Sequence, residues 1–500
     1  MSVVLHGPDV LGLAAYRRVV LEGERVELDD GVLDEVDRSR AAMLSHIATG
    51  VPAYGVTTGL GYMASRPVGE EDQPALQRSL LTGRASGLGA PLPADVVRGV
   101  MLLRLVGFLH GAPGVSAGLC RFLADRLNDG WSPVVPAGPY GAAGEVGPLA
   151  HLFQTLVGEG LVALDGEHVP AGEALGRLGV EPYDPGPKEG LALINGSPCA
   201  TAWAVHLGDL GRRLLDQATR TAALAVALTG ASARAFAAGV GALGGDEAEQ
   251  AVARSLRALL EGEPGLDGPK QPPVSFRVVP QVHGALLRSF DDLSATVEGR
   301  LRAVTDSPLF LPGGGAGEAE SEAEGLYPSG AFHALGVTLR LEAVGLAAAH
   351  AVNLVEKRLH RLLDARFSGL PEQLSRRPGV EVGAVSMHKT VVGLAAESRL
   401  LATPASLHAF DTSAGQEDVQ ANTLLAAERV RSLLANLETA LACELVALRQ
   451  AAYLRERPLE APGLAHAVAR LAEAVPAIEE DRTLSPDVER VVALLRTGAL

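Results

Sequence analysis

Two long stretches of the chain repeat apolar residues at helical spacing. Residues 334–364 read ALGVTLRLEAVGLAAAHAVNLVEKRLHRLLD, and residues 424–457 read LLAAERVRSLLANLETALACELVALRQAAYLRER. Apolar side chains recur every three or four positions in both, as they do on one face of an amphipathic helix. Both stretches exceed the roughly 8–20 residues of an ordinary globular helix, which predicts a helical bundle or the core of an oligomer.

The first 190 residues follow a different pattern. Short helical stretches alternate there with turns rich in glycine and proline, at residues 51–65, 86–93 and 134–145. Turns of this kind often carry functional side chains. We therefore expect an N-terminal region, residues 1–190, that carries the loops of a site. Residues 191–500 are expected to form the bundle of long helices and the C-terminal helices.

Two segments of unusual composition need separate interpretation. Residues 221–245 are the most apolar part of the chain, but they are rich in small residues and interrupted by Arg234. We expect a buried helix there rather than a membrane span. Residues 313–325, GGGAGEAESEAEG, are acidic and of low complexity, which predicts a mobile surface loop because such a composition cannot bury a core.

Composition narrows the class of protein. Of the 500 residues, 47% are hydrophobic and only 4% aromatic, which suits an all-α fold of closely packed helices. The net charge of −16, with both signs spread along the chain, argues against a nucleic-acid partner. Cys120, Cys199 and Cys443 are far apart and form no metal-binding spacing, so we expect neither a zinc site nor disulfides. The N-terminus lacks the features of a signal peptide, and a cytoplasmic location is expected.

Five glycine-rich or polar motifs occur in a particular order along the chain. They are YGVTTGLG (54–61), GPYGAAGEVGPLAH (138–151), KEGLALINGSPCATA (188–202), QPPVSFRVVPQVHGA (271–285) and TSAGQEDVQ (412–420), with TDSPL, SGAFH and ATPAS as further anchors. Together, from about residue 5 to about residue 450, they resemble the histidine and aromatic amino-acid ammonia-lyases. The resemblance implies a mainly helical ammonia-lyase fold, a homotetramer with shared active sites, and a small amino-acid-like substrate.

The resemblance gives the second motif a chemical meaning. In this family an Ala-Ser-Gly triplet cyclises to 4-methylideneimidazol-5-one (MIO), an electrophile that activates the substrate for loss of ammonia. This chain has Ala142-Ala143-Gly144 at that place, and Ala143 has no β-hydroxyl to lose. We therefore predict that the MIO cofactor is absent. The glycines of the motif are expected to remain because the tight turn still has to be built.

Three residues match the catalytic positions of the family. Tyr54 matches the tyrosine that removes the β-proton, Arg277 the arginine that binds the α-carboxylate, and Glu417 a glutamate near the amino group or ring of the substrate. A guanidinium fork suits a planar carboxylate, and a carboxylate can hold a cationic group. The alternatives are a tyrosine packed at a loop end, a structural ion pair and a carboxylate at a helix start.

Further residues are expected to line the site. Asn195 and Gln281 match amides that orient the substrate, Gln271 is expected to support the same loop, and Phe332 lies in the SGAFH anchor. For the amides a purely structural role is the alternative, because buried amides are commonly hydrogen-bonded for structural reasons.

The chain also departs from the family pattern. Val274 replaces a tyrosine, Glu145 an aspartate, and Ser307 and Thr57 asparagines. Arg84 stands where histidine-type members carry the histidine that selects the substrate ring. Arg84 is expected to read an anionic or strongly polar tail of the substrate, the alternative being a salt bridge to a neighbouring acid. Because a single engineered knockout would change Ala143 alone, these clustered departures indicate that the alanine is native.

Three functions remain open after this reasoning. The first is a lyase without MIO that abstracts a β-proton and eliminates a good α-leaving group, such as the trimethylammonium of a betaine, to give an α,β-unsaturated acid. The second is a remodelled isomerase, cyclase or dehydratase reaction in biosynthesis on the same scaffold. The third is a non-catalytic homologue that binds a ligand or partners an active lyase. The first predicts acidic or aromatic groups around Glu417, and the third predicts that Tyr54 or Arg277 is occluded.

Overall fold

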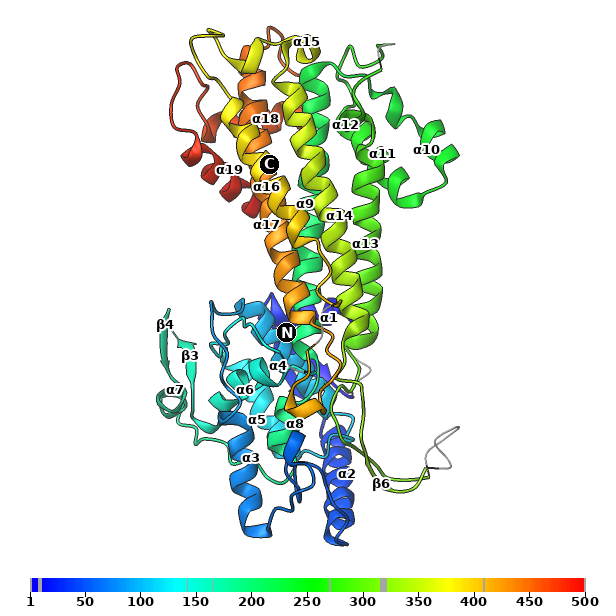
Figure 1. The fold of residues 1–500 in the computed structure, drawn as a ribbon, viewed down its shortest axis with the longest axis vertical. Helices are drawn as coiled ribbons and strands as arrows, with labels where there is room; N and C mark the ends of the chain where they lie inside the picture. Colours follow the sequence, from blue (N-terminus) through cyan, green and yellow to red (C-terminus); the bar gives the residue numbers. More distant parts are fainter. Residues whose placement is uncertain are drawn as a thin grey trace. The chain divides into compact units, whose positions relative to one another are not determined.

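The computed structural model describes residues 2–7, 11–141, 143–164, 166–268, 271–314, 322–407 and 410–498. The fold is mainly helical (Figure 1), which confirms the predicted class. In the described residues the strands form two-stranded sheets: β1 (Ser2–Leu5) pairs with β2 (Arg25–Leu28) in parallel, and two antiparallel pairs are β3 (Leu161–Leu164) with β4 (Glu167–Pro170) and β5 (Leu309–Leu311) with β6 (Gly325–Tyr327).

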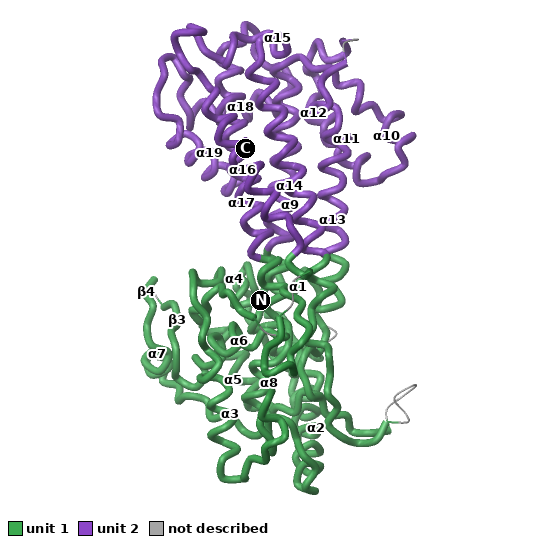
Figure 2. The backbone as a smooth tube through the Cα atoms, viewed as in Figure 1, with its two compact units in different colours: residues 1–206, 294–339, 405–427 green, residues 207–293, 340–404, 428–500 purple. Residues whose placement is uncertain are grey.

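The chain divides into two compact units (Figure 2). Unit 1 consists of residues 1–206, 294–339 and 405–427, and unit 2 of residues 207–293, 340–404 and 428–500. Four long helices contribute residues to both units: α9 (Pro198–Thr229), α13 (Val279–Arg300), α14 (Leu335–Leu362) and α17 (Thr423–Leu454). Because each unit is assembled from three separate segments, the boundary expected at residue 190 does not separate them.

Unit 1 carries the shorter elements. Its helices are α1 (Leu13–Val20), α2 (Asp30–Ala48), α3 (Gln73–Thr82), α4 (Ala94–Phe108), α5 (Ala117–Asn128), α6 (Val146–Phe153), α7 (Ala171–Arg177) and α8 (Glu189–Ile194). The 3₁₀ turns η2 (Gly61–Met63), η3 (Glu70–Asp72) and η4 (Gln154–Val157) lie between them, and η8 (Ser413–Gly415) lies in the segment before α17.

Unit 2 is helical throughout its described elements. Besides its share of the four long helices it contains α10 (Ala238–Gly244), α11 (Glu247–Leu259), α12 (Val274–Arg277), α15 (Ala365–Ser368), α16 (Val385–Leu401), α18 (Pro462–Ala474) and α19 (Ser485–Thr497). The 3₁₀ turns η5 (Ala233–Phe236) and η7 (Glu372–Leu374) complete it.

The two long periodic stretches form the helices that they predict. Helix α14 buries one face completely, at Leu341, Val344, Ala348, Val352, Val355 and Leu359. These positions alternate steps of three and four residues, so they lie on one stripe of the helix and pack into the bundle. Within the same core, Arg358 on α14 donates two hydrogen bonds to Glu444 on α17, at 2.9 and 2.7 Å, and both side chains are fully buried.

The apolar stretch 221–245 does not form the single buried helix that we expected. Helix α9 ends at Thr229 and Gly230 adopts a φ of 62°, a left-handed conformation that terminates helices and favours glycine. The residues up to Leu228 are buried, whereas Val240 and Leu243 on α10 are 54% and 92% exposed. The small residues therefore belong to α9, η5 and α10, which lie in different environments.

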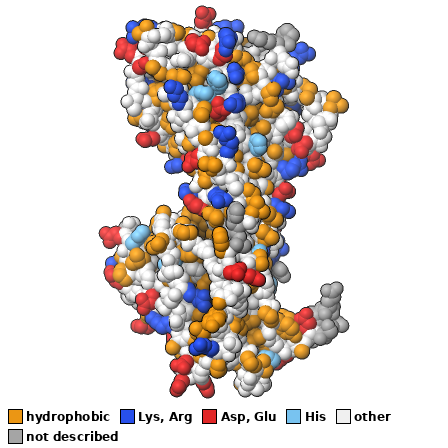
Figure 3. Space-filling view, in the orientation of Figure 1, with side chains coloured by type: hydrophobic (Ala, Val, Ile, Leu, Met, Phe, Trp, Pro, Cys, Tyr) orange, Lys and Arg blue, Asp and Glu red, His pale blue; other side chains and the backbone are white. Residues whose placement is uncertain are grey.

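The cysteines, the surface charge, the apolar helix α14 and the acidic stretch can now be compared with the expectations. Cys120, Cys199 and Cys443 are free and buried, so no disulfide joins them. Acidic and basic side chains are interspersed over the face drawn in Figure 3. Within the described residues, α14 is long and apolar enough to cross a membrane, and half of its most apolar window is buried inside the protein. Most of the acidic stretch 313–325 lies outside the described residues, namely 315–321.

Candidate active site

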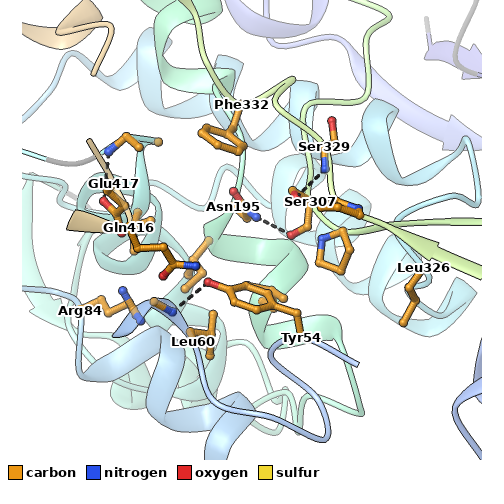
Figure 4. Close-up of a pocket in the computed structure, with 18 of the residues that line it drawn as sticks. Tyr54, Leu60, Arg84, Asn195, Ser307, Leu326, Ser329, Phe332, Gln416 and Glu417 are labelled. Atoms are coloured by element: carbon orange, nitrogen blue, oxygen red, sulfur yellow. Dashed lines mark hydrogen bonds between the residues drawn. The ribbon is translucent and has the colours of Figure 1, made fainter. Parts of the chain in front are cut away.

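A cavity of about 440 Å³ lies within unit 1, and side chains from four of the five sequence motifs line it (Figure 4). This volume suits a small organic ligand. Its lining residues are Pro52, Tyr54, Leu60, Gly61, Arg84, Ala143, Gly144, Val146, Leu191, Ile194, Asn195, Ser307, Pro308, Leu326, Pro328, Ser329, Phe332, Gln416 and Glu417.

The loop that carries Tyr54 is held in one conformation by its neighbours. Gly55 has a φ of 70°, and a Cβ on it would lie 2.6 Å from Leu191 Cδ2, so glycine is required. The buried Gln77 of α3 donates to the Gly55 carbonyl at 2.8 Å and accepts from the Leu191 amide of α8 at 3.3 Å. The Thr57 hydroxyl accepts from the Ala53 amide at 2.8 Å. The tyrosine therefore enters the cavity from a fixed backbone.

The hydroxyl of Tyr54 points into the cavity (Figure 4) and accepts a hydrogen bond from the Gly61 amide at 2.9 Å. A donor on the phenolic oxygen stabilises negative charge there, which is what a tyrosine acting as a base requires. Gly61 itself has a φ of 56°. This hydrogen bond joins the two ends of the YGVTTGLG motif.

The triplet turn lies in the wall of this cavity. Ala142 is outside the described residues, whereas Ala143 and Gly144 line the pocket. The Ala143 side chain is a methyl group without an oxygen, so the residues present do not fit MIO, which requires a β-hydroxyl at this position. The amide of Ala143 instead donates to Glu417 Oε2 at 3.1 Å.

The expectation that the turn needs its glycines holds at one position and not at another. Gly138 has a φ of 114°, and a Cβ on it would lie 2.8 Å from the ring of Tyr140. At Gly144 an added Cβ would meet nothing closer than 3.7 Å, which is ordinary contact. The backbone therefore requires glycine at the start of the motif but not within the triplet itself.

Glu145, directly after the triplet, fixes the turn to helix α9. Its carboxylate is 5% exposed and accepts hydrogen bonds from the amides of Cys199 and Ala200, both at 2.6 Å, in the first turn of α9. A helix N-terminus favours a negative group in this place. Burial nevertheless raises the pKa of Glu145 to about 7, while the two amide donors act to lower it.

Glu417 is held by three donors. Its Oε2 accepts from the Ala143 amide and from Thr412 Oγ1 at 3.0 Å, and its Oε1 accepts from Ser413 Oγ at 2.8 Å. Ser413 and Ala414 have φ values of 53° and 55°, which non-glycine residues rarely adopt. Strained backbone of this kind is typical of functional sites. The result is an oriented carboxylate at the cavity wall.

Asn195 and Ser307 connect two motifs on another wall of the cavity. Asn195 follows α8 and donates from Nδ2 to the Ser307 carbonyl at 2.5 Å. The Ser307 hydroxyl accepts from the Ser329 amide at 2.9 Å. Within the described parts of the chain, the side-chain oxygen of Asn195 has no hydrogen-bond partner, so it can accept from a ligand. Phe332 adds an aromatic face near Gly144.

Arg84 brings a cationic side chain to the cavity wall. It follows α3 and is half-buried. Among the residues that the structure describes, its guanidinium makes no hydrogen bond or ion pair, so the salt bridge considered as its alternative role is not formed. Figure 4 places Arg84 on the same side of the cavity as Gln416 and Glu417.

The remaining predicted site residues belong to unit 2 and do not line this cavity. Arg277 donates from Nε to the Pro272 carbonyl at 3.0 Å and, with the Gln271 amide oxygen turned toward it, from Nη1 at 2.6 Å. Val274 is 58% exposed. Gln281 donates to Glu249 Oε2 at 2.9 Å. These residues lie on α12, on the segment before it and on α13, and their substrate contacts stay a prediction.

Several lining residues were not singled out from the sequence. Gln416 and Ser329 are the polar ones, and Leu60, Leu191 and Leu326 are apolar. Gln416 directly precedes Glu417, and Ser329 belongs to the SGAFH anchor, so position in a motif was the available signal. The leucines gave no signal because nothing in their local pattern separates them from core positions.

Comparison with known proteins identifies the family. The sequence model of the family "Aromatic amino acid lyase" matches residues 11–475. The chain is 36% identical to the histidine ammonia-lyase of Symbiobacterium thermophilum, over 99% of this chain and 95% of the relative. It is also 36% identical to that of Aromatoleum aromaticum, over 100% and 94%. The chain therefore belongs to the aromatic amino acid lyase family, which includes the histidine ammonia-lyases.

Solved structures show the same fold. The ergothioneine-degrading enzyme ergothionase of Treponema denticola superposes with a TM-score of 0.93 at 24% identity, covering 99% of both chains. A tyrosine aminomutase of Streptomyces globisporus has a TM-score of 0.89 at 28% identity, covering 100% of this chain and 97% of that one. The ammonia-lyase fold is thus confirmed over the whole chain.

Proposed function

We propose that this chain is a lyase that works without MIO on an amino-acid-derived substrate whose α-substituent is already a good leaving group. A betaine with a quaternary trimethylammonium group is the substrate class that we favour. The observation that carries the proposal is the composition of one cavity: the Tyr54 hydroxyl, the Glu417 carboxylate and the Phe332 ring line it together with the methyl group of Ala143.

The chemistry follows from what these groups can do. The phenolate form of Tyr54 takes the β-proton, the electrons of the C–H bond form the C=C bond, and the C–N bond breaks to release trimethylamine. The products are an α,β-unsaturated acid and a protonated Tyr54. Loss of ammonia from a free amine would need electrophilic activation, which a methyl group cannot supply.

The cavity also contains groups that suit a quaternary cation. A trimethylammonium group has no N–H to donate, so it is bound by negative charge and aromatic faces rather than by hydrogen bonds. Glu417 supplies the charge, held in place by Thr412, Ser413 and the Ala143 amide. Phe332 and Tyr54 supply aromatic faces.

The proposal includes an assembly and a location. Arg277 would hold the α-carboxylate, and because it belongs to unit 2 and not to the cavity of its own chain, a shared site in a homotetramer is the arrangement that we propose. The cytoplasm is the proposed location, in keeping with the three unpaired cysteines.

The test is a substrate panel. Purified protein is incubated with α-amino acids and their N,N,N-trimethyl betaines, and conjugated-alkene absorbance and released amine are measured. Ergothioneine is included because ergothionase shares the fold. We expect activity on betaines only. Tyr54→Phe should lower kcat by about 10²–10⁴-fold, as expected for loss of a general base.

Tyr62→Phe is the matched control, because this tyrosine lies in the same loop, is 70% exposed and does not line the cavity. Its activity should equal that of the wild type. Turnover of free amino acids would contradict the absence of an electrophile. Betaine turnover that Tyr54→Phe leaves intact would remove Tyr54 as the base. Silence across the panel would favour a remodelled reaction or a non-catalytic homologue.

A further inference from the structure

Three side chains with metal-binding atoms meet in unit 2, none of which lines the cavity described above. Glu356 and His360 lie one turn apart on α14, so they project from the same face of that helix. His388 comes from the neighbouring helix α16. One ligand atom from each lies within 4.8 Å of the other two.

The contacts within this group are close but leave ligand atoms available. His388 Nε2 and Glu356 Oε1 are 2.7 Å apart. The rings of His360 and His388 stack with their centroids 4.6 Å apart and their planes at 18°. In the described portion of the chain, the ring nitrogens of His360 have no hydrogen-bond partner. The His360 imidazole therefore lies beside the other two groups, and its ring nitrogens do not hydrogen-bond to them.

Solvent exposure differs between the two sides of the group: Glu356 and His388 are mostly buried, and His360 is exposed. The side chain of Glu356 is 7% exposed and that of His388 18%, whereas His360 is exposed, so the group opens to solvent on the His360 side. Lys357 Nζ lies 2.6 Å from Glu356 Oε2. The lysine neutralises one carboxylate oxygen and competes with a cation, but it leaves Oε1, which contacts His388.

We propose that Glu356, His360 and His388 form a binding site for one divalent transition-metal ion of the zinc type. Two imidazole nitrogens and one carboxylate oxygen are a donor set that Zn²⁺ prefers, whereas Mg²⁺ and Ca²⁺ prefer oxygen alone. Bonds to such an ion are about 2.0–2.2 Å long, so His360 must approach the other two ligands. A rotation of the exposed His360 ring provides this movement, and water completes the coordination. His388 Nε2 and Glu356 Oε1, which are 2.7 Å apart, must exchange their mutual hydrogen bond for bonds to the ion.

The site has a consequence for the fold rather than for the proposed reaction. An ion held by α14 and α16 crosslinks two helices of the bundle, so it stabilises the folded state by the free energy of binding. Because a ligand that binds only the folded state raises its melting temperature, metal should raise Tm. This effect should appear whether or not the protein eliminates betaines.

The experiment uses the full chain, freed of metal by a chelator and then titrated with ZnCl₂ in a calorimeter, with Co²⁺ as a spectroscopic probe. We expect one ion per chain and visible Co²⁺ bands of low-symmetry coordination. Loss of a group that only hydrogen-bonds to a metal ligand lowers metal affinity about 10–100-fold. His360→Ala and His388→Ala remove a ligand itself, so each should lower the affinity for zinc by at least about this factor. In these variants, zinc should no longer raise Tm.

His350→Ala is the matched control, because His350 is exposed on the same helix and outside the group. It should bind zinc as the wild type does. His360 is exposed, so His360→Ala keeps the test valid even if His388→Ala disturbs folding. The absence of zinc binding, or binding of equal affinity in wild type and His360→Ala, would overturn the proposal.

Discussion

At the scale of single residues, Arg84 has the most direct consequence for specificity. It is a cation in the cavity wall that has no partner among the described residues. A charge that the protein leaves unpaired beside a cavity is available to a ligand anion. The substrate should therefore carry a negative or strongly polar tail in addition to its α-carboxylate.

This leads to a prediction for Arg84→Met. A hydrogen bond to a charged group contributes about 1.5–3 kcal/mol, so KM for a substrate with an anionic tail should rise about 10–100-fold. The value of kcat should change little, because the contact is equally present in the ground state and the transition state. Steady-state kinetics with paired substrates, with and without the anionic tail, measure the effect.

Arg78→Met is the control, because Arg78 on α3 contacts Glu159 and the Val157 carbonyl and does not line the cavity. If Arg84→Met raised KM equally for the substrates with and without the anionic tail, Arg84 would not bind that tail.

At the scale of secondary-structure elements, two sets of buried polar contacts position the site. Glu145 attaches the triplet turn to the start of α9, and the ion pair Lys188–Asp306, at 2.7 Å and fully buried, attaches the start of α8 to the segment that carries Ser307. Each joins two motifs that are distant in sequence.

Glu145 should give the protein a pH-dependent stability. Burial raises its folded-state pKa from 4.5 to about 7, so the folded protein binds more protons than the unfolded chain between these values. Its contribution is fully present below pH 4.5 and is lost as the pH rises through about 7. The full difference is of the order of 3 kcal/mol.

Glu145→Gln removes this titration. The difference in Tm between the wild type and the variant should be smaller at pH 8 than at pH 5. Thermal melts of both proteins at the two pH values measure this difference. Glu173→Gln on α7, a carboxylate whose side chain is 51% exposed, is the control and should track the wild type. A difference between wild type and Glu145→Gln that is the same at both pH values would contradict the role of burial.

Lys188→Met should destabilise the protein by about 3–5 kcal/mol, because the buried Asp306 carboxylate loses its cationic partner and keeps only the Ser307 amide as a donor. The double variant Lys188→Met/Asp306→Leu should recover part of the loss, since no unpaired charge remains. Denaturant unfolding measures both. Arg177→Met, which breaks an exposed pair with Glu173, should cost no more than about 1 kcal/mol. Equal losses in the single and double variants would refute the unpaired charge as the cause.

At the scale of the whole molecule, the chain leaves apolar side chains exposed on long helices. Leu346 on α14 is 55% exposed, and Val392 and Leu400 on α16 are 43% and 76% exposed. Large apolar groups on helices of this length favour association with further copies. This agrees with the proposed homotetramer, in which Arg277 from one subunit would complete the cavity of another.

A complementation experiment tests this arrangement. Tyr54→Phe and Arg277→Ala chains are co-expressed, so that mixed oligomers form. If one subunit supplies Tyr54 and another supplies Arg277, about a quarter of the sites in a random mixture contain both native residues. Betaine-lyase activity should then exceed that of either variant alone.

The pair Tyr54→Phe and Glu417→Gln is the control, because both residues line the cavity of one chain and no mixture can restore it. Recovery in the control, or no recovery with Arg277→Ala in oligomers shown to be mixed, would contradict the shared site.

The sequence by itself determined the helical class and much of the cavity. Periodicity is a local property, so residues 334–364 and 424–457 predicted α14 and α17 to within a few positions. The ordered motifs led to Tyr54, Asn195, Phe332 and Glu417, all of which line the cavity. Motif positions carry this information because they are short and contiguous in the chain.

Only the tertiary structure decided how distant segments meet. The end of α9 at Gly230 depends on a backbone angle. Contacts between elements produce the hydrogen bonds of Gln77 to the Tyr54 loop and the group of Glu356, His360 and His388. A contact between two helices does not change the hydrophobic periodicity of either one, so the sequence pattern does not reveal it. For that reason the sequence predicted the parts of the site, while packing determined the cavity and the cluster of metal-binding side chains.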